Sequence, residues 1–511
     1  MSDEPQNSPA VQEENLNTDA LRAQRLAKVE RLKAAGQNPY GHGVSGIIDS
    51  GSARAKYVDE GTEVKVRVAG RLVSKRVMGK SSFAHILDQE GRIQLYFQKN
   101  VVGDEPYAAF KDLDIGDILV ADGTLFQTRT GEVSVRVNDF ELLAKSLRPL
   151  PEKFHGLTDT EQRYRQRYLD LISNEEVRKT FVLRSRIISE IRRYLDERGY
   201  LEVETPMMQP LAGGAAAAPF TTHYNALNTT MYLRIATELY LKRLIVGGFE
   251  KVYEIGRQFR NEGMDRKHNP EFTSIEIYTA YSDCQGTMEL MEDMLTTIAQ
   301  KLFGTLQFQH GERTVDLSRP WRRVTYHDLI RERLGQDWFD LPLEQQRAKA
   351  RELGVVKGIE EMDSVHLTHE IYDKTIEDTL VNPTFVTRLP AYLVPLAKRC
   401  ADDPSLVDVY ELEVNGQELS PGYSELNDPI EQRSRFDQQL IGRSDLEGEV
   451  DRIDEDFLTA MEHGMPPTGG IGMGIDRLVM LLTGQDSIRD VVLFPQMKLQ
   501  KTGAPSASPN T

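Results

Sequence analysis

Residues 251–281, with the sequence KVYEIGRQFRNEGMDRKHNPEFTSIEIYTAY, contain the clearest indication of the fold. The two ends of this stretch predict strands, and the polar loop from Asn261 to Pro270 joins them into a hairpin. Because side chains alternate across a strand, the second strand has one mixed polar face and one apolar face. The first face carries Phe272, Ser274, Glu276 and Tyr278, and the second carries Thr273, Ile275 and Ile277. The first face predicts a ligand-binding floor, although a half-buried sheet with Glu276 in solvent is the commoner arrangement.

The loop of this hairpin is rich in charge. Arg260 and Glu262 open it, and Arg266, Lys267 and His268 follow. Cations gathered beside a strand end suit the phosphates of a nucleotide. This composition favours an anion and nucleotide site over a plain solvated loop.

A second hairpin is predicted around Asn415-Gly416, a strong two-residue turn sequence. Such a turn would place Glu413 opposite Glu418 and Glu411 opposite Ser420, with the three glutamates on one face. Like charges so close raise one another's pKa unless a cation lies among them, and Mg²⁺ held by one or two carboxylates and phosphates is the natural candidate. The competing interpretation, simpler on these residues alone, has Glu413 and Glu418 pointing into water.

A third element is GGIGMGIDR, residues 469–477, ahead of an apolar helix over 478–482. Glycines at alternate positions leave one strand face without side chains, so a ligand could lie against the backbone. Arg477 falls in the first turn of the helix. The spacing is not that of a dinucleotide-binding fingerprint.

The chain around these elements predicts more than one domain. Its 511 residues are too many for one ordinary core. A long helix with a stripe from Phe181 to Leu195 stops at Gly199, and the remainder mixes strands and helices in no βαβ rhythm. We therefore predict an α+β fold in which an antiparallel sheet is flanked by helices.

Residues 63–143 have a different pattern, with short alternating strands and one helical stretch after the third. Five such strands predict a small closed barrel of the OB type. The predicted organisation is a disordered N-terminus over 1–16, a helix and barrel over 17–145, a linker over 146–167, an α+β domain over 168–501 and a disordered tail over 502–511.

The strand pair at the start of the barrel is basic. Between Val64 and Leu87 there are six Lys or Arg residues and no acid, and Phe83, His85 and Tyr96 are close by. Cations and aromatic rings on a barrel face suit single-stranded RNA, but a solvated barrel edge explains them equally well.

The overall composition sets further bounds. The net charge of −17 alone disfavours a nucleic-acid partner, but the local distribution of charge matters more than the total. Cys284 and Cys400 have no metal-binding spacing and are interpreted as structural. No apolar run is long enough to span a membrane and no signal core is present, so we expect a cytoplasmic protein without a membrane partner.

Taken together, these elements resemble the three signature motifs of class II aminoacyl-tRNA synthetases. The first resembles Gly199-Tyr200-Leu201-Glu202-Val203-Glu204-Thr205-Pro206, the second Phe259-Arg260-Asn261-Glu262, and the third Gly472-Met473-Gly474-Ile475-Asp476-Arg477. Other stretches resemble the lysyl-tRNA synthetase family, among them residues 74–80, 161–168, 268–273 and 424–429. The likeness extends from about Asn17 to Lys501.

The resemblance implies roles for individual residues. Arg260 and Arg477 would be catalytic, and ATP would be bound by Arg260, Glu262, His268, Asn269, Phe272 and Arg477. Lysine would be bound by Gly214, Glu238, Glu276, Tyr278 and Glu425. Magnesium would be held by Glu411 and Glu418, and the anticodon would be read by Arg71, Phe83, Gln94 and Glu132.

The implied function is ATP-dependent activation of L-lysine and its transfer to the 3' end of tRNA(Lys), with Mg²⁺ as cofactor and a homodimer as the assembly. A carboxylate attacking the α-phosphorus needs positioning and charge neutralisation and no protein nucleophile. Buried carboxylates would reject an amino acid with a neutral side chain, because they would be left unpaired.

Some positions depart from the family pattern. Pro421 stands where an asparagine is usual, Tyr392 and Val394 where an acid and a hydroxyl are usual, Ala218 where an arginine is usual, and Glu413 where an aromatic is usual. These departures leave open a paralogue that activates a lysine analogue or another amino acid. A non-catalytic RNA-binding protein on the same scaffold is the other alternative, and the joint presence of Arg260, Glu411, Glu418 and Arg477 disfavours it.

Overall fold

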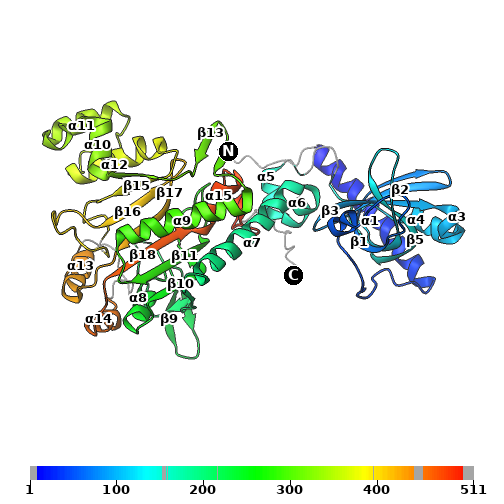
Figure 1. Ribbon diagram of the computed structural model, residues 1–511, viewed down its shortest axis with the longest axis horizontal. Helices are drawn as coiled ribbons and strands as arrows, with labels where there is room; N and C mark the ends of the chain where they lie inside the picture. The colour runs from blue at the N-terminus through cyan, green and yellow to red at the C-terminus, as the bar shows by residue number, and fades with distance from the viewer. Residues whose placement is uncertain are drawn as a thin grey trace, which may run out of the picture. The chain divides into compact units, whose positions relative to one another are not determined.

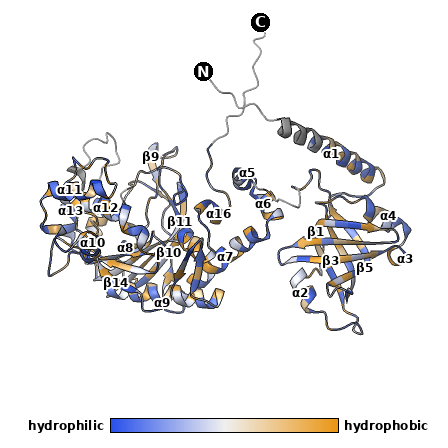
Figure 2. Cartoon of the chain, turned by 90° about the horizontal axis from the view of Figure 1, so that it is seen from above, coloured by the Kyte–Doolittle hydropathy of each residue, from blue (hydrophilic) through white to orange (hydrophobic). Residues whose placement is uncertain are grey.

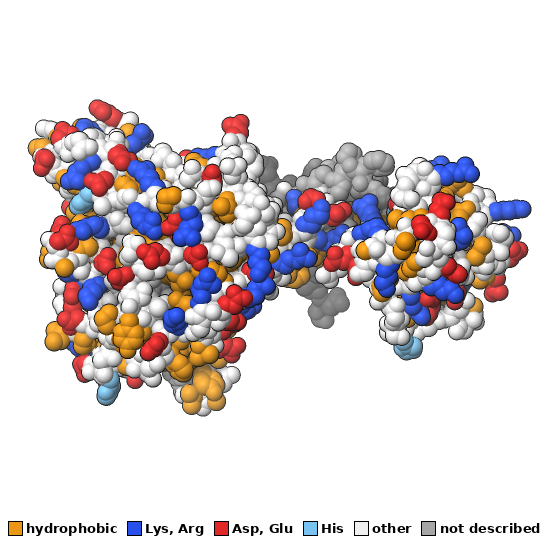
Figure 3. Space-filling view, in the orientation of Figure 1, with side chains coloured by type: hydrophobic (Ala, Val, Ile, Leu, Met, Phe, Trp, Pro, Cys, Tyr) orange, Lys and Arg blue, Asp and Glu red, His pale blue; other side chains and the backbone are white. Residues whose placement is uncertain are grey.

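The computed structural model describes residues 9–151, 157, 159–215, 217–394, 396–441 and 453–498. The chain divides into two compact units, Met1–Glu175 and Glu176–Thr511, both drawn in Figure 1. Each unit has a hydrophobic core of its own. Acidic and basic side chains are interspersed over the visible face of each unit, so the negative net charge does not collect there on one surface (Figure 3).

Unit 1 is a closed five-stranded barrel, as predicted. Strands β1 (Lys65–Met78), β2 (Ser81–Asp88), β3 (Gly91–Gln98), β4 (Ile118–Gln127) and β5 (Val133–Ala144) close in the order β1-β2-β3-β5-β4. Helices α3 (Lys99–Val102) and α4 (Asp104–Asp112) follow the third strand, and α2 (Ser50–Ala55) precedes the first. Apolar residues such as Val66, Val68 and Leu95 alternate into the core, which gives the barrel strands their mixed colouring in Figure 2.

Helix α1 (Pro9–Ala34) precedes the barrel and starts earlier than the predicted Asn17. Arg25 ties the helix to the barrel by donating to the carbonyls of Ile115 at 3.1 Å and Arg148 at 2.9 Å. The predicted tail over 502–511 lies outside the described residues.

The segment after the barrel contains two short helices, α5 (Thr160–Arg165) and α6 (Arg167–Ser173). Asp159 caps α5 by accepting hydrogen bonds from the backbone of Glu161 and Gln162. Part of the stretch predicted as a linker is therefore helical, because the proline-rich start of the segment says nothing about the capped turn that follows it.

Unit 2 is built on an eight-stranded sheet with the order β14-β15-β16-β17-β18-β11-β10-β6. The strands are β6 (Leu201–Glu202), β10 (Lys251–Phe259), β11 (Glu271–Ala280), β14 (Arg322–Thr325), β15 (Thr384–Thr387), β16 (Val409–Glu413), β17 (Glu418–Ser424) and β18 (Thr468–Gly474). Neighbours from β15 to β10 pair antiparallel, whereas the outermost pairs β14·β15 and β10·β6 are parallel. The predicted antiparallel sheet with flanking helices is confirmed, with a parallel strand added at each edge.

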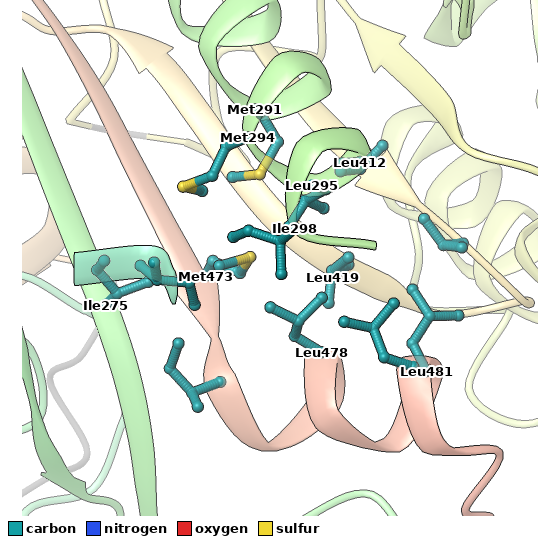
Figure 4. Packing of buried hydrophobic residues seen from close by; sticks show 14 of the residues in the cluster. Ile275, Met291, Met294, Leu295, Ile298, Leu412, Leu419, Met473, Leu478 and Leu481 are labelled. Atoms are coloured by element: carbon teal, nitrogen blue, oxygen red, sulfur yellow. The ribbon is translucent and has the colours of Figure 1, made fainter. Parts of the chain in front are cut away.

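One face of this sheet is closed by an apolar core. Helices α7 (Glu175–Asp196), α9 (Cys284–Phe303) and α15 (Ile475–Thr483) contribute to it. Figure 4 shows Met291, Met294, Leu295 and Ile298 of α9 lying against sheet residues and against Leu478 of α15. Because this face is filled, a ligand can reach the sheet only from its other face.

The remaining elements surround the sheet. They are β7 (Met208–Gln209), β8 (Thr221–Tyr224), β9 (Thr229–Leu233), α8 (Glu238–Val246), β12 (Gln307–His310), β13 (Arg313–Asp316), α10 (Tyr326–Leu334), η1 (Trp338–Asp340), α11 (Leu343–Glu352), α12 (Ser364–Thr375), η2 (Glu377–Thr379), α13 (Pro429–Ile441), α14 (Glu455–Glu462) and α16 (Ile488–Val491). A separate core around Trp338 and Tyr372 holds the helices α10 to α12 together.

Candidate active site

Strand β11 forms the floor of a cavity of about 420 Å³ in unit 2. Ser274, Glu276 and Tyr278 line this cavity, whereas Ile275 and Ile277 pack into the core on the other side of the sheet. This is the alternation that the sequence predicts for the strand. The same strand therefore holds the sheet on its core and presents polar groups to a ligand.

The cavity brings together most of the candidate residues of unit 2. Its lining includes Gly214, Glu238, Arg260, Glu262, His268, Asn269, Phe272, Glu276, Tyr278, Glu418, Glu425 and Arg477. Glu411 does not line it, although its neighbour across the sheet, Pro421, does. Residues up to about 260 positions apart in the chain thus meet in one pocket.

Glu276 lies at the closed end of the cavity and is only 9% exposed. Its Oε1 accepts a hydrogen bond from the Thr237 N–H at 3.0 Å, and its Oε2 accepts one from the Tyr278 O–H at 3.1 Å. Burial raises the pKa of Glu276, and the nearby charge of Glu238 adds to the rise. The interpretation that placed Glu276 in solvent is wrong.

Two further carboxylates at this end share a buried cation. Lys242 is fully buried, and its Nζ lies 2.6 Å from Glu238 Oε1 and 2.5 Å from Glu425 Oε2. Burial opposes the charge on Lys242, but Glu238 and Glu425 outweigh it and raise its pKa above the usual lysine value. The closed end is therefore a set of buried acids around one resident ammonium group.

Gly470 makes room for one of these acids. A β-carbon at position 470 would overlap Glu425 Oε1, whereas one at Gly472 would come no nearer than 3.8 Å, to the Pro421 ring. The two alternate glycines of β18 are therefore required for different physical reasons. Gly470 admits a protein carboxylate, and Gly472 leaves open space.

At the open end of the cavity, one buried side-chain donor has no hydrogen-bond partner among the described residues. Arg260 extends over the Phe272 ring, with its guanidinium carbon 5.2 Å from the ring centre, and its buried Nε is this donor. Arg477 donates to the Glu418 carbonyl at 2.5 Å. Glu262 and His268 are exposed, and His268 Nδ1 lies 2.9 Å from Asp265 Oδ2.

Asn269 lines the cavity but has protein partners for its amide. Its Nδ2 donates to the Glu271 carbonyl at 2.6 Å, and its Oδ1 accepts from the Gln496 N–H at 3.3 Å. Both groups are thus engaged in holding the base of the loop in shape.

The acidic hairpin differs from its prediction in register. Glu413 faces Glu418 as expected, but a bulge then shifts the pairing, so Glu411 faces Pro421 and not Ser420. Turn length fixes the register only up to the first irregularity, and Leu419 is the extra residue here.

Glu413 does not point into water, since it is 1% exposed. Its Oε2 has no hydrogen-bond partner among the described residues. Burial, together with Glu411, Glu377 and Glu418, raises the pKa of Glu413 to about 10. Within the described chain, no group of three or more His, Cys, Asp or Glu side chains is arranged to hold a metal ion. Arg477 lies 3.8 Å from Glu418, whereas Glu411 and Glu413 form no ion pair in the part of the chain that the structure describes. Neighbouring carboxyl groups of this kind fit a cation that takes its other ligands from phosphates.

On the barrel of unit 1, three of the four candidate residues lie together. Gln94 donates to Glu132 at 2.8 Å, His85 Nε2 lies 3.0 Å from Glu132, and the Phe83 ring stacks on Tyr96 at 4.7 Å between centres. Arg71 lies apart, because it pairs with Leu87 whereas Phe83 pairs with Arg76, and it donates to the Gly116 carbonyl at 2.9 Å.

Comparisons with known proteins match both units. The sequence pattern of the class II tRNA synthetases (D, K and N) matches residues 159–498, and that of the OB-fold nucleic acid binding domain matches residues 66–143. The lysine–tRNA ligase of Halalkalibacterium halodurans is 52% identical over 95% of this chain and 98% of its own length. That of Carboxydothermus hydrogenoformans is 51% identical over 93% and 97%, and that of Bacillus subtilis 49% identical over 95% and 98%.

The chain belongs to the class II lysyl-tRNA synthetase family. Of the positions that depart from the family pattern, Pro421 alone lines the cavity among the described residues. Tyr392 is 42% exposed and donates its O–H to the Val365 carbonyl at 3.3 Å. Ala218 contributes its backbone carbonyl to Asn261, and its side chain is not part of the lining. Tyr392, Val394, Ala218 and Glu413 are therefore not part of the lining of this cavity.

Lys242 is the main residue that sequence reasoning missed. Its spacing of four residues from Glu238 on a helix could have indicated an ion pair. That spacing does not reveal burial, which depends on Glu425 from a distant strand. Cys284 and Cys400 are both buried and free, in keeping with a structural role. Among the helices of the described ranges, none has the length and apolar character needed to cross a bilayer.

Proposed function

We propose that this protein activates L-lysine with ATP and transfers the lysyl group to the 3' end of tRNA(Lys). The observation that carries the proposal is the cavity with three buried carboxylates at one end and Arg260 at the other. A diamino acid offers two ammonium groups to the acids and one carboxylate to the arginine. An uncharged side chain would leave a buried acid unpaired, which costs about 1–3 kcal/mol or more.

In the first step, an oxygen of the lysine carboxylate bonds to the α-phosphorus of ATP. The bond from that phosphorus to the bridging oxygen breaks, and pyrophosphate leaves with the electron pair. Arg260, with its free Nε, would hold the lysine carboxylate against the α-phosphate and offset the charge that builds up there. Phe272 and Arg477 would enclose the adenine, and Glu262 and His268 would contact the nucleotide from the loop.

Glu276, Tyr278 and Glu425 would receive the side-chain ammonium, while Glu238 would take the α-ammonium beside Gly214. Gly214 has a φ of +85°, and a β-carbon there would lie 3.1 Å from Ala236. Glycine therefore lets the loop backbone pack closely against Ala236 and against Glu238, the acid that would take the α-ammonium.

Glu411 and Glu418 are the residues that would hold magnesium, with Glu413 behind them. When bound, the ion would neutralise phosphate charge during pyrophosphate departure. The assignment is supported by the crowding of acids in the hairpin, where burial and neighbouring glutamates raise the pKa values of Glu411 and Glu413.

In the second step, a ribose hydroxyl at the 3' end of the tRNA attacks the lysyl carbonyl, and AMP leaves with the carboxylate oxygen. The barrel of unit 1 would bind the anticodon through stacking on Phe83 and through the polar edges of Gln94 and Glu132. Arg71 would contribute a phosphate contact at a distance from these residues.

We also infer a homodimer. Strand β6 lies at an edge of the eight-stranded sheet, and Leu201 on it is 46% exposed. An open strand edge with an apolar side chain suits pairing with a second copy of the chain. Sedimentation of the wild type and of Leu201→Glu checks this, and a wild-type monomer at micromolar concentration would contradict it.

The test of the proposed function is amino-acid-dependent exchange of pyrophosphate into ATP. Lysine is compared with ornithine, arginine, β-lysine and norleucine. Exchange with lysine alone is expected. Exchange with a different amino acid would mean that the protein is a paralogue of different specificity, as Pro421 suggests. No exchange with any amino acid would favour a non-catalytic scaffold.

A further inference from the structure

The closed end of the cavity contains more buried acid than buried base. Glu238, Glu276 and Glu425 are 6%, 9% and 2% exposed, and all three line the cavity. Lys242 is their resident cation, and it touches Glu238 and Glu425 from behind without lining the cavity itself. The other buried acid in the lining, Asp476, is already paired with Arg184 at 2.5 Å.

Three carboxyl groups at this end share one resident cation, so two of them lack a cation of their own. A substrate with two ammonium groups supplies both, whereas one with a single ammonium group leaves one buried carboxyl group without a cationic partner. Leaving a buried polar group unpaired is expensive, so this count discriminates between diamino and monoamino acids independently of side-chain length.

The position of Lys242 also fixes geometry. One Nζ in contact with both Glu238 and Glu425 holds the carboxylate of helix α8 and that of the segment after β17 at a set separation. Gly470 supports this arrangement, since a side chain there would displace Glu425 from its place. The two carboxylates are thus ordered without substrate.

We propose that Lys242 is a positioning residue for lysine specificity, which acts by holding the carboxyl groups of Glu238 and Glu425 in register for the two ammonium groups of the substrate. This inference rests on the proposed lysine activation and assigns part of its specificity to a residue that does not touch the substrate.

The titration of Glu425 makes the proposal measurable. Burial raises the pKa of Glu425 to about 8, and Lys242 opposes that rise. The groups that face this carboxylate are Lys242 and Glu238 from α8, Glu276 and Tyr278 from β11, and Tyr423 from β17. Without the lysine cation the neighbours are acidic or neutral, so the pKa of Glu425 would rise further.

The experiment is Lys242→Met, with lysine and ATP kinetics in pyrophosphate exchange from pH 6.5 to 9. A substrate ammonium binds the ionised carboxylate, so the lysine KM falls as pH rises towards the pKa of Glu425. In the variant this fall moves to higher pH. At pH 7 the lysine KM should rise about tenfold or more, because an opposite charge at contact shifts a pKa by about one to three units.

The matched control is Arg243→Met, which removes the adjacent cation of the same helix. Arg243 pairs with Asp454 at 2.7 Å and Asp456 at 3.0 Å, away from the cavity. Its lysine KM and pH profile should follow the wild type. The ATP KM should stay within about twofold of the wild-type value in both variants, since neither substituted residue is proposed to contact the nucleotide.

The outcomes distinguish a failure of the proposed function from a failure of the proposed role of Lys242. If wild-type protein shows no lysine-dependent exchange, the proposed function fails. If wild type exchanges and Lys242→Met keeps the wild-type lysine KM at every pH, or raises the ATP KM equally, the role of Lys242 is wrong while the function stands. Should Lys242→Met not fold, Lys242→Gln keeps an N–H donor without the charge and must show the same shift of the pH profile.

Discussion

The closed and open ends of the cavity differ in how the protein holds their polar groups. At the closed end, both oxygens of Glu276 accept hydrogen bonds and Lys242 bridges two acids, while the buried Oε1 of Glu425 has no hydrogen-bond partner within the described residues. At the open end, Arg260 Nε has no partner within the described residues and His268 is exposed. The acids of the closed end, proposed to bind the amino acid, are therefore held in place by the protein itself, whereas Arg260 at the open end keeps an unbonded donor that a phosphate could complete.

The largest effect is expected from removing the unsatisfied cation. Arg260→Ala should lower the rate of lysine-dependent pyrophosphate exchange on the order of a thousandfold, because it removes a donor aimed at charge that develops in the transition state. The KM for lysine should change less than the turnover rate. Exchange at saturating ATP and lysine measures the loss.

Arg257→Ala is the matched control on the same hairpin. Arg257 lies outside the cavity lining and pairs with Glu271 at 3.6 Å. Equal losses in the two variants would mean that hairpin charge in general, and not Arg260 in the cavity, supports the reaction. The contrast between the two ends would then have no catalytic meaning.

A smaller effect is expected at the preformed end. Glu276→Gln removes a charged acceptor worth about 1.5–3 kcal/mol, so the lysine KM should rise about 10- to 150-fold with little change for ATP. Burial raises the pKa of Glu276, so ionising it costs stability in the ligand-free protein. The variant should accordingly unfold at the same temperature as the wild type or higher.

Thermal unfolding and lysine KM measured on the same preparation test both statements. Glu271→Gln, at the start of the same strand and half-exposed, is the control and should leave both quantities unchanged. A Glu276→Gln protein with lower thermal stability and unchanged KM would show that Glu276 is structural.

The two alternate glycines of β18 give a third comparison. Gly470→Ala places a methyl group on Glu425 Oε1, and displacing that carboxylate should raise the lysine KM about tenfold at a stability cost of about 1–3 kcal/mol. Gly472→Ala meets its first atom at 3.8 Å and should leave the lysine KM nearly unchanged. Similar lysine KM values in both variants would show that β18 tolerates a side chain anywhere and that the closed end is not preformed.

The floor of the cavity could be predicted because it depends on local alternation. Strand β11 must turn Ile275 and Ile277 to the core, and this alone puts Glu276 and Tyr278 on the other face. The barrel could be predicted for the same reason. Periodicity fixes which face a side chain takes whenever the strand stays regular.

The features that the sequence did not predict are ones that the periodicity of side chains does not encode. A bulge at Leu419 moves Glu411 opposite Pro421, and no residue in the turn predicts it. Lys242 is buried only because Glu425, far along the chain, supplies its second partner. Pairings between distant segments, and breaks in regularity, have to be observed.

The smallest effect is expected at the exposed part of the open end. His268 and Asp265 lie in contact with side chains 54% and 61% exposed, so solvent screens most of the energy of this contact. His268→Ala should raise the ATP KM about threefold and leave the lysine KM unchanged, because a single exposed contact is worth about 0.5–1 kcal/mol. His366→Ala is a close match, since His366 pairs with Asp363 at the same spacing and exposure but outside the cavity. If His268→Ala instead raises the ATP KM a hundredfold, the loop must close over the nucleotide and bury His268. The open end would then hold its ligand as firmly as the closed end once ATP is bound.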